Sequence, residues 1–405
     1  MAGNVPNSND IEGGVNYVHD SVTGRIKTAE IEFAGYIIPD QAFLQVSPDD
    51  IKKAGAGILG LGPNDGSKIY QAIPTVAGAA LLDRIFLQNL TTPNYLTVLL
   101  GRSGDLTDFY GGSLTVGQVI SGFEDILKQP KLPVVNSIAA DLHFQVLLDK
   151  NGFIGPDGKP IVIRTEVDST QNEEQATVVL DTGFSLPQVP SSLAAEIYGR
   201  FLGAQLVDID SVGKIWLLPC SQEVSITLKF NNKSYPIHPL DVTLDPTIIG
   251  MSAVVDSKGY PLCIGTFQPF TYDTGAKPSY DMVLGMAFLR NVYVLMDYGD
   301  FISGSNRKKD APYVQFLSTT NATEGKSHDD FIKVRLNGTD NMTNHVPQLR
   351  GIHPVVYYIA ISIACVVVMA GATLFFIFRA RKRSADRRKR AISARLPPEL
   401  SVTTW

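Results

Sequence analysis

The sequence has few of the residues on which several classes of functional site depend. It contains three cysteines, two tryptophans and six scattered histidines among 405 residues, and only 19% of its residues are charged. It contains no G-x-S-x-G and no H-E-x-x-H pattern, which argues against those types of serine hydrolase and zinc protease. No group of cysteines and histidines has the spacing of a metal site, so we expect neither a metal nor a cofactor.

Charge is distributed unevenly along the chain. After residue 378, nine basic side chains face two acidic ones, a net charge of +7 that leaves −12 for the residues before it. Nucleic-acid binding needs Lys and Arg clustered against phosphate groups. The acidic body therefore predicts no nucleic-acid partner.

One long apolar run, VVYYIAISIACVVVMAGATLFFIF, occupies residues 355–378. Its length suits a hydrocarbon core of roughly 30 Å. A buried globular helix is the alternative, but such helices rarely lack a polar face. The following basic residues predict a cytosolic C-terminus and an extracellular or lumenal body. We expect a single-pass helix in the lipid bilayer at residues 354–378 and a basic cytosolic tail at residues 379–405, rather than a GPI signal.

The features expected of a lumenal body are incomplete at the N-terminus. The first residues contain neither the basic nor the apolar region of a secretory signal, so we expect the natural chain to begin upstream of Met1. Glycosylation sequons are present before the membrane segment, at Asn89, Asn232, Asn321, Asn337 and Asn341.

Cys220 and Cys263 are the cysteines outside the apolar run, which contains Cys365. In an oxidising lumen they are natural disulfide partners. A zinc site is the alternative, but two cysteines do not supply four ligands.

The body has the composition of a β protein. Its 24 prolines, low charge and β-branched runs favour strands over long helices, and we expect an all-β fold. Polar–apolar alternation over residues 15–43 predicts β-hairpins, and a second β-rich block covers about residues 132–313. Residues 316–353 are rich in Ser, Thr and Asn and are predicted to form a glycosylatable stalk.

One acidic residue follows an apolar strand in a turn opened by glycine. Residues 177–185 read T-V-V-L-D-T-G-F-S, which predicts a carboxylate, Asp181, held at the floor of a cleft. Gly183 permits close approach of another backbone, and the hydroxyls of Thr182 and Ser185 are candidates to donate hydrogen bonds to the carboxylate. A second D-T-G at residues 273–275 is flanked by loop residues, and we interpret it as a surface turn.

Residues 281–297, DMVLGMAFLRNVYVLMD, resemble the C-terminal signature of pepsin-like aspartic endopeptidases. The resemblance covers about residues 10–315 and implies a bilobal acid-protease fold, with catalytic Asp181 and with the strand ending at Gly285 beside the D-T-G strand. It implies a partial N-terminal lobe at 1–130, a C-terminal lobe at 131–315, peptide or protein substrates, and a monomer.

Two first-lobe segments resemble elements of the same family. Residues 56–62, A-G-I-L-G-L-G, are similar to the strand that accompanies the first catalytic loop. Gly55, Gly57 and Gly60 also match a dinucleotide-binding fingerprint by letters, but no apolar strand precedes them and Pro63 denies them the following helix. Residues 17–24 resemble the substrate-covering flap, with Tyr17 at the flap tyrosine, although the family usually has glycine at positions 18 and 20. A packed hairpin aromatic is the alternative for Tyr17.

The resemblance implies that the two lobes are an internal duplication, which also predicts where the first catalytic aspartate lies. Gly183 precedes Gly285 by 102 residues, and the same offset from Gly60 falls about 42 residues before Met1. We therefore expect an incomplete copy of an active membrane-anchored endopeptidase. A pseudoprotease that binds peptides without hydrolysis is the main alternative, and a symmetric dimer with Asp181 from two chains is a third.

Overall fold

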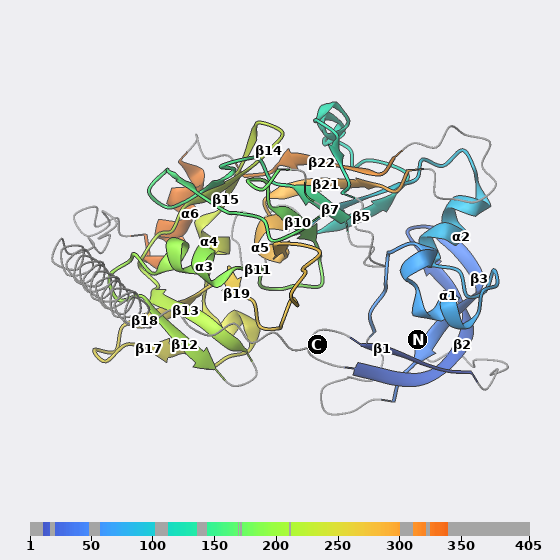
Figure 1. Cartoon of the computed structure of the whole chain (residues 1–405), viewed down its shortest axis with the longest axis horizontal. Helices are drawn as coiled ribbons and strands as arrows, with labels where there is room; N and C mark the ends of the chain where they lie inside the picture. Colours follow the sequence, from blue (N-terminus) through green and yellow to red (C-terminus); the bar gives the residue numbers. More distant parts are fainter. Residues whose placement is uncertain are drawn as a thin grey trace, which may run out of the picture. The chain divides into compact units, whose positions relative to one another are not determined.

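A computed structural model describes residues 11–16, 21–47, 57–101, 112–135, 144–168, 170, 172–209, 212–299, 311–320 and 325–338. Strands predominate among them (Figure 1). The chain divides into two compact units, residues 1–348 and 349–405, and the second lies outside the described residues together with the predicted membrane segment. Across the described ranges, none of the helices has the length and apolar character to span a bilayer.

The first sheet is an antiparallel meander in the order β1-β2-β3 and confirms the hairpins predicted for residues 15–43. Its strands are β1 (Glu12–Asn16), β2 (Ser21–Phe33) and β3 (Tyr36–Gln45). After η1 (Asn64–Gly66) come the helices α1 (Lys68–Ala72) and α2 (Leu81–Gln88). The apolar residues of α2 recur at helical spacing, so one face of the helix is buried in the same core as Ile38 of β3.

A second sheet joins strands from distant parts of the sequence. Its order is β5-β4-β21-β22-β6, all antiparallel. The strands are β4 (Tyr95–Leu99), β5 (Ser113–Val116), β6 (Leu132–Pro133), β21 (Val292–Asp297) and β22 (Tyr313–Ser318), with η2 (Glu124–Lys128) between β5 and β6. Strands on both sides of the lobe boundary predicted at residue 130 therefore pair with one another.

A third sheet, in the order β19-β11-β20-β10-β7, carries the segment with Asp181. Its strands are β7 (Phe144–Leu147), β10 (Thr177–Leu180), β11 (Gln188–Val189), β19 (Gln268–Pro269) and β20 (Met282–Leu284). Strand β20 is parallel to β10 on one side and antiparallel to β11 on the other. The chain between β10 and β11 must therefore pass over the end of β20.

Two further sheets complete the second half. One has the order β15-β14-β8-β9, and the other has the order β12-β13-β18-β16 with β17 paired to β18. Their strands are β8 (Phe153–Ile154), β9 (Pro160–Ile161), β14 (Ile226–Phe230), β15 (Lys233–Ile237), β12 (Gln205–Ile209), β13 (Gly213–Pro219), β16 (Thr243–Leu244), β17 (Val254–Val255) and β18 (Pro261–Gly265). The connecting helices are α3 (Ser191–Tyr198), α4 (Pro239–Val242), η3 (Pro246–Ile249) and α5 (Met286–Leu289).

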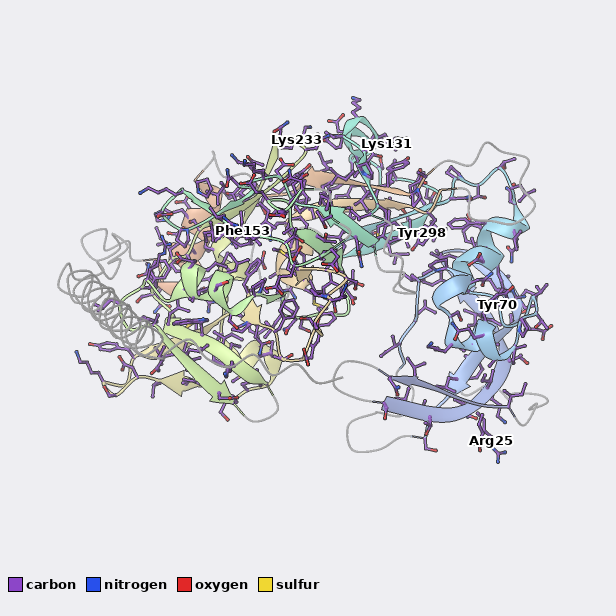
Figure 2. All side chains as sticks on the ribbon, in the orientation of Figure 1. Arg25, Tyr70, Lys131, Phe153, Lys233 and Tyr298 are labelled. Carbon is purple, nitrogen blue, oxygen red and sulfur yellow. A yellow bond between two sulfur atoms is a disulfide. The ribbon has the colours of Figure 1, made fainter. Side chains whose placement is uncertain are left out.

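Aromatic side chains join these layers. Phe316 of β22 lies 5.3 Å from Phe230 of β14 and 5.4 Å from Phe288 of α5, centroid to centroid. Phe153, labelled in Figure 2, meets the ring of Phe267 at 90° and 5.9 Å. Edge-to-face contacts of this kind add to the apolar area that the rings bury.

The segment predicted as a stalk differs from that expectation in its described part. Strand β22 continues to Ser318, and residues Lys326–Arg335 form a helix, α6. Phe331 of α6 is only 1% exposed, and the Arg335 guanidinium donates to the carbonyl of Thr243 at 3.0 Å. The polar composition of the segment gave no indication that Phe331 would be buried. Its ring is enough to hold this short helix against the body.

Candidate active site

Asp181 lies in a tight turn directly after strand β10. Its amide donates to the carbonyl of Leu284 in β20 at 3.2 Å, and the amide of Phe184 donates back to the carbonyl of Asp181 at 3.4 Å. The amide of Gly183 donates to the carboxylate oxygen Oδ1 at 2.7 Å. The neighbouring strand and the turn thus fix both the backbone and one carboxylate oxygen of Asp181.

Gly285 brings the end of β20 against this turn. Leu180 and Leu284 are register partners, which confirms the predicted pairing of the two strands. A Cβ atom at position 285 would lie 2.0 Å from the carbonyl oxygen of Phe184, far inside contact distance. The same oxygen accepts a hydrogen bond from the amide of Met286 at 2.9 Å. The turn and the start of α5 can therefore meet only because residue 285 has no side chain.

The role predicted for the hydroxyls of Thr182 and Ser185, hydrogen bonding to the Asp181 carboxylate, stays a prediction. Both side chains are exposed, while the backbone amide of Gly183 donates to Oδ1 of the carboxylate. A Cβ at Gly183 would lie 3.0 Å from Oδ1, so glycine also keeps the approach to the carboxylate open.

An apolar wall follows the Asp181 turn. Leu186 packs against a buried cluster that includes Ile215 and Leu217 of β13. The other partly buried side chains that pack against the same cluster are Val207, Ile209, Val212, Ile249 and Val254. Behind this wall, the side chain of Gln188 is buried at 3% exposure. The sequence analysis did not identify Leu186 or Gln188 as site residues. The feature that could have identified them is the L-P-Q-V-P run directly after the turn.

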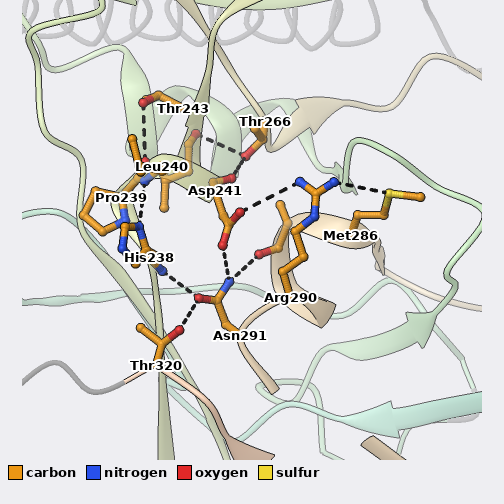
Figure 3. A network of polar contacts seen from close by, with 12 residues as sticks. His238, Pro239, Leu240, Asp241, Thr243, Thr266, Met286, Arg290, Asn291 and Thr320 are labelled. Atoms are coloured by element: carbon orange, nitrogen blue, oxygen red, sulfur yellow. Dashed lines mark hydrogen bonds and ion pairs between the residues drawn. The ribbon is translucent and has the colours of Figure 1, made fainter. Parts of the chain in front are cut away.

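A buried polar network fixes the far end of α5 (Figure 3). The side-chain amide of Asn291 donates to Oδ2 of Asp241 at 2.9 Å and to the carbonyl of Ala287 at 2.7 Å. Its oxygen accepts from the amide of His238 at 2.9 Å and from the hydroxyl of Thr320 at 2.5 Å. Since the side chain of Asn291 uses both donors and both lone pairs, α5 is held from Gly285 to its last turn.

Comparison with known proteins agrees with this geometry. A family model described as eukaryotic aspartyl protease matches residues 6–305. The chain belongs to this family.

Relatives of the chain are fungal aspartyl proteases by name. It is 28% identical over 131 residues to "Major aspartyl peptidase 1" of Cryptococcus neoformans var. grubii. This match covers 32% of this chain and 24% of the relative. It is 24% identical over 292 residues to "Probable aspartic-type endopeptidase CTSD" of Arthroderma benhamiae, which covers 71% of this chain and 48% of the relative. The match to the protein of the same name in Trichophyton verrucosum has the same extent and identity. The chain thus spans half or less of the length of these family members.

Two further predictions concern the second D-T-G and the flap tyrosine. The second D-T-G is a surface turn as predicted, because Asp273 is exposed and its Oδ1 accepts from the amide of Gly275, whose φ is +79°. Tyr17, the predicted flap tyrosine, lies outside the described residues.

The first-lobe counterpart of β20 is not a strand. Residues 57–62 have no regular structure, and Ile58 and Leu59 are 79% and 47% exposed. In the C-terminal lobe, Val283 and Leu284 are buried because β10 and β11 pair on either side of them. The strand that would pair with Ile58 and Leu59 in the same manner is absent from the described residues, so their side chains stay in water.

The predicted disulfide is confirmed. Cys220 and Cys263 are joined with an S–S distance of 2.08 Å between the end of β13 and strand β18. Of the predicted glycosylation sites, Asn89, Asn232 and Asn337 have exposed side chains, while Asn321 and Asn341 lie outside the described residues. In the described part of the chain, no group of His, Cys, Asp or Glu side chains is arranged to hold a metal ion.

Proposed function

We propose that this protein is an aspartic-type endopeptidase and that Asp181 is the second of its two catalytic aspartates. The observation that carries the proposal is the Asp181 turn, in which Gly285 admits the carbonyl of Phe184 and the amide of Gly183 holds one carboxylate oxygen. Asp181 is half-buried while Thr182 and Gly183 are exposed. A peptide substrate can therefore approach a carboxylate whose position is already fixed.

The chemistry requires a second carboxylate facing the first. Two carboxylates about 3 Å apart share one proton, because both cannot ionise cheaply. One activates a water that attacks the scissile carbonyl, and the other donates a proton to the carbonyl oxygen, without a covalent enzyme intermediate. The pair titrates as a unit. Asp181 alone cannot perform both roles.

We infer that the first aspartate is encoded upstream of Met1. Two observations support this: the 102-residue offset within the C-terminal lobe, and the exposure of Ile58 and Leu59. A peptide-binding pseudoprotease is the second candidate. It applies if no second carboxylate faces Asp181.

The test begins with the 5′ end of the transcript and a peptide-cleavage assay on the protein that it encodes. Pepstatin and the Asp181→Asn substitution should each abolish cleavage, whereas Asp273→Asn, in the surface D-T-G, should leave it unchanged. A transcript that starts at Met1, and a product without cleavage at acidic or neutral pH, would reject the protease in favour of the peptide-binding protein.

We further propose that residues 354–378 anchor the protein in a bilayer, with the protease body extracellular or lumenal and the tail cytosolic. The uncharged run and the basic residues after it support this arrangement. A C-terminally tagged protein should resist alkaline extraction from membranes and lose only its tag to protease added from the cytosolic side. Release by alkaline carbonate would contradict the anchor.

A further inference from the structure

We propose that Gln188 and Gln268 are positioning residues that couple the Asp181 turn to the β12–β13 hairpin and so set the apolar wall against which substrate lies. The inference rests on the proposed endopeptidase function. It concerns two buried side chains, each 3% exposed, in neighbouring strands β11 and β19.

The side chain of Gln188 is bonded on every side. Its Nε2 donates to Oε1 of Gln268 at 3.0 Å and to the carbonyl of Leu186 at 3.4 Å. Its Oε1 accepts from the amide and the hydroxyl of Thr271, both at 3.1 Å. Because a primary amide has two donors and two lone pairs, these four contacts use its full capacity and leave one orientation.

Gln268 extends the connection to the hairpin. Its Nε2 donates to the carbonyl of Val212 at 2.6 Å, and its backbone amide donates to the carbonyl of Pro187 at 2.9 Å. Val212 and Gly213 lead into β13, and a Cβ at Gly213 would lie 2.9 Å from the side chain of Thr271. The hairpin therefore approaches the glutamine pair closely and is held by it.

The coupled segments also share one apolar cluster. Leu186, which follows the Asp181 turn, packs against the same buried cluster as Val207, Ile209 and Val212 of the hairpin region. Apolar contacts alone allow such side chains to slide and repack, whereas a satisfied buried polar network specifies one arrangement. The glutamine pair thus determines where Leu186 stands relative to Asp181.

The variants Gln188→Met and Gln268→Met keep the volume and remove the hydrogen bonds. For a peptide with leucine beside the scissile bond, each variant should raise KM about five-fold or more and leave kcat within about two-fold. The lost hydrogen bonds order the apolar wall, so their removal should weaken substrate binding more than the chemical step. The effect should shrink for the matching alanine peptide. The double variant should be no worse than either single one, because both remove the same coupling.

Gln145→Met is the matched control, because Gln145 is a buried glutamine of the same sheet with no hydrogen bond to its side chain among the described residues. It should leave KM and the leucine-to-alanine ratio unchanged. If Gln188→Met, Gln268→Met and Gln145→Met each lose the same activity towards both peptides, in step with a lowered Tm, the glutamine pair only supports folding. That result would overturn the proposal.

A readout without catalysis separates this inference from the proposed function. In hydrogen-exchange measurements, Gln268→Met should raise the exchange rates of the amides in residues 182–187 and in the hairpin together, by about ten-fold. The two segments should respond together because they open as one hydrogen-bonded unit. If the wild-type protein cleaves nothing, the endopeptidase proposal fails while this measurement still tests the coupling. Exchange unchanged in residues 182–187 would refute it.

Discussion

At the scale of single residues, Gly285 decides how closely β20 and α5 approach the Asp181 turn. We expect Gly285→Ala to destabilise the protein by about 1–3 kcal/mol or to displace the turn, because the added Cβ meets a backbone oxygen at 2.0 Å. Urea unfolding and peptide cleavage measure both effects. Gly57→Ala is the control, since nothing lies within 4 Å of a Cβ there. Equal stability of the two variants would contradict the steric account.

Asp245 gives a pH-dependent prediction at the same scale. Its Oδ1 accepts from the hydroxyl of Thr247 at 2.7 Å and from the amide of Thr247 at 2.9 Å, and the hydroxyl bond is the main cause that lowers the pKa of Asp245, against the effect of burial. A lowered pKa contributes stability that is present above the unfolded value of roughly 3.9 and lost as the pH falls through the folded value.

Asp245→Asn should therefore be less stable than the wild type at pH 6 and should approach it near pH 2. Urea titrations at the two values measure the difference, and NMR titration of the carboxyl should give a midpoint below roughly 3.9. A stability difference that does not change with pH would contradict the charge-based explanation.

At the scale of elements, α6 is held to the body by one ring and a few polar contacts. Besides Phe331, His328 lies 2.7 Å from Glu223, and His238 lies 3.6 Å from Asp330. Phe331→Ala should cost about 3–5 kcal/mol of docking free energy, since a fully buried ring leaves a cavity. Limited proteolysis should then cut within residues 325–338. Val334→Ala is the control, because Val334 is 42% exposed. Equal resistance of both variants would show that the ring does not hold α6.

Elements differ in how far the sequence predicts them. The hairpins of β1–β3 and the pairing of β10 with β20 were predictable, because alternation and the apolar V-L-G run reflect contacts that the chain itself supplies. Of the strand expected at residues 56–62, the described part, residues 57–62, is not a strand, since an apolar run of this length becomes a strand only when a partner strand is present. The α6 helix was missed because the segment is polar on average and Phe331 is the one apolar side chain of the helix that is buried, which gives no periodic signal.

At the scale of the whole molecule, the disulfide constrains the unfolded chain. It closes a separation of 43 residues between Cys220 and Cys263. Replacing both cysteines by alanine should lower the free energy of unfolding by about 4 kcal/mol in the chain-entropy account. Urea unfolding of the oxidised wild type and the double variant measures the loss, and a loss under about 1 kcal/mol would mean that the unfolded chain is already compact in this region.

The sheet that contains β4 and β21 determines when the protein can finish folding. Val98 pairs with Val294, so the pairing waits until almost all of the described chain has been synthesised. At about 5–20 residues per second, the ribosome needs roughly 10–40 s to pass from one strand to the other. During that interval β4 and β5 have an open edge. A nascent chain therefore exposes an unpaired strand edge to association with other chains for longer than a protein whose strands pair with their nearest neighbours in sequence.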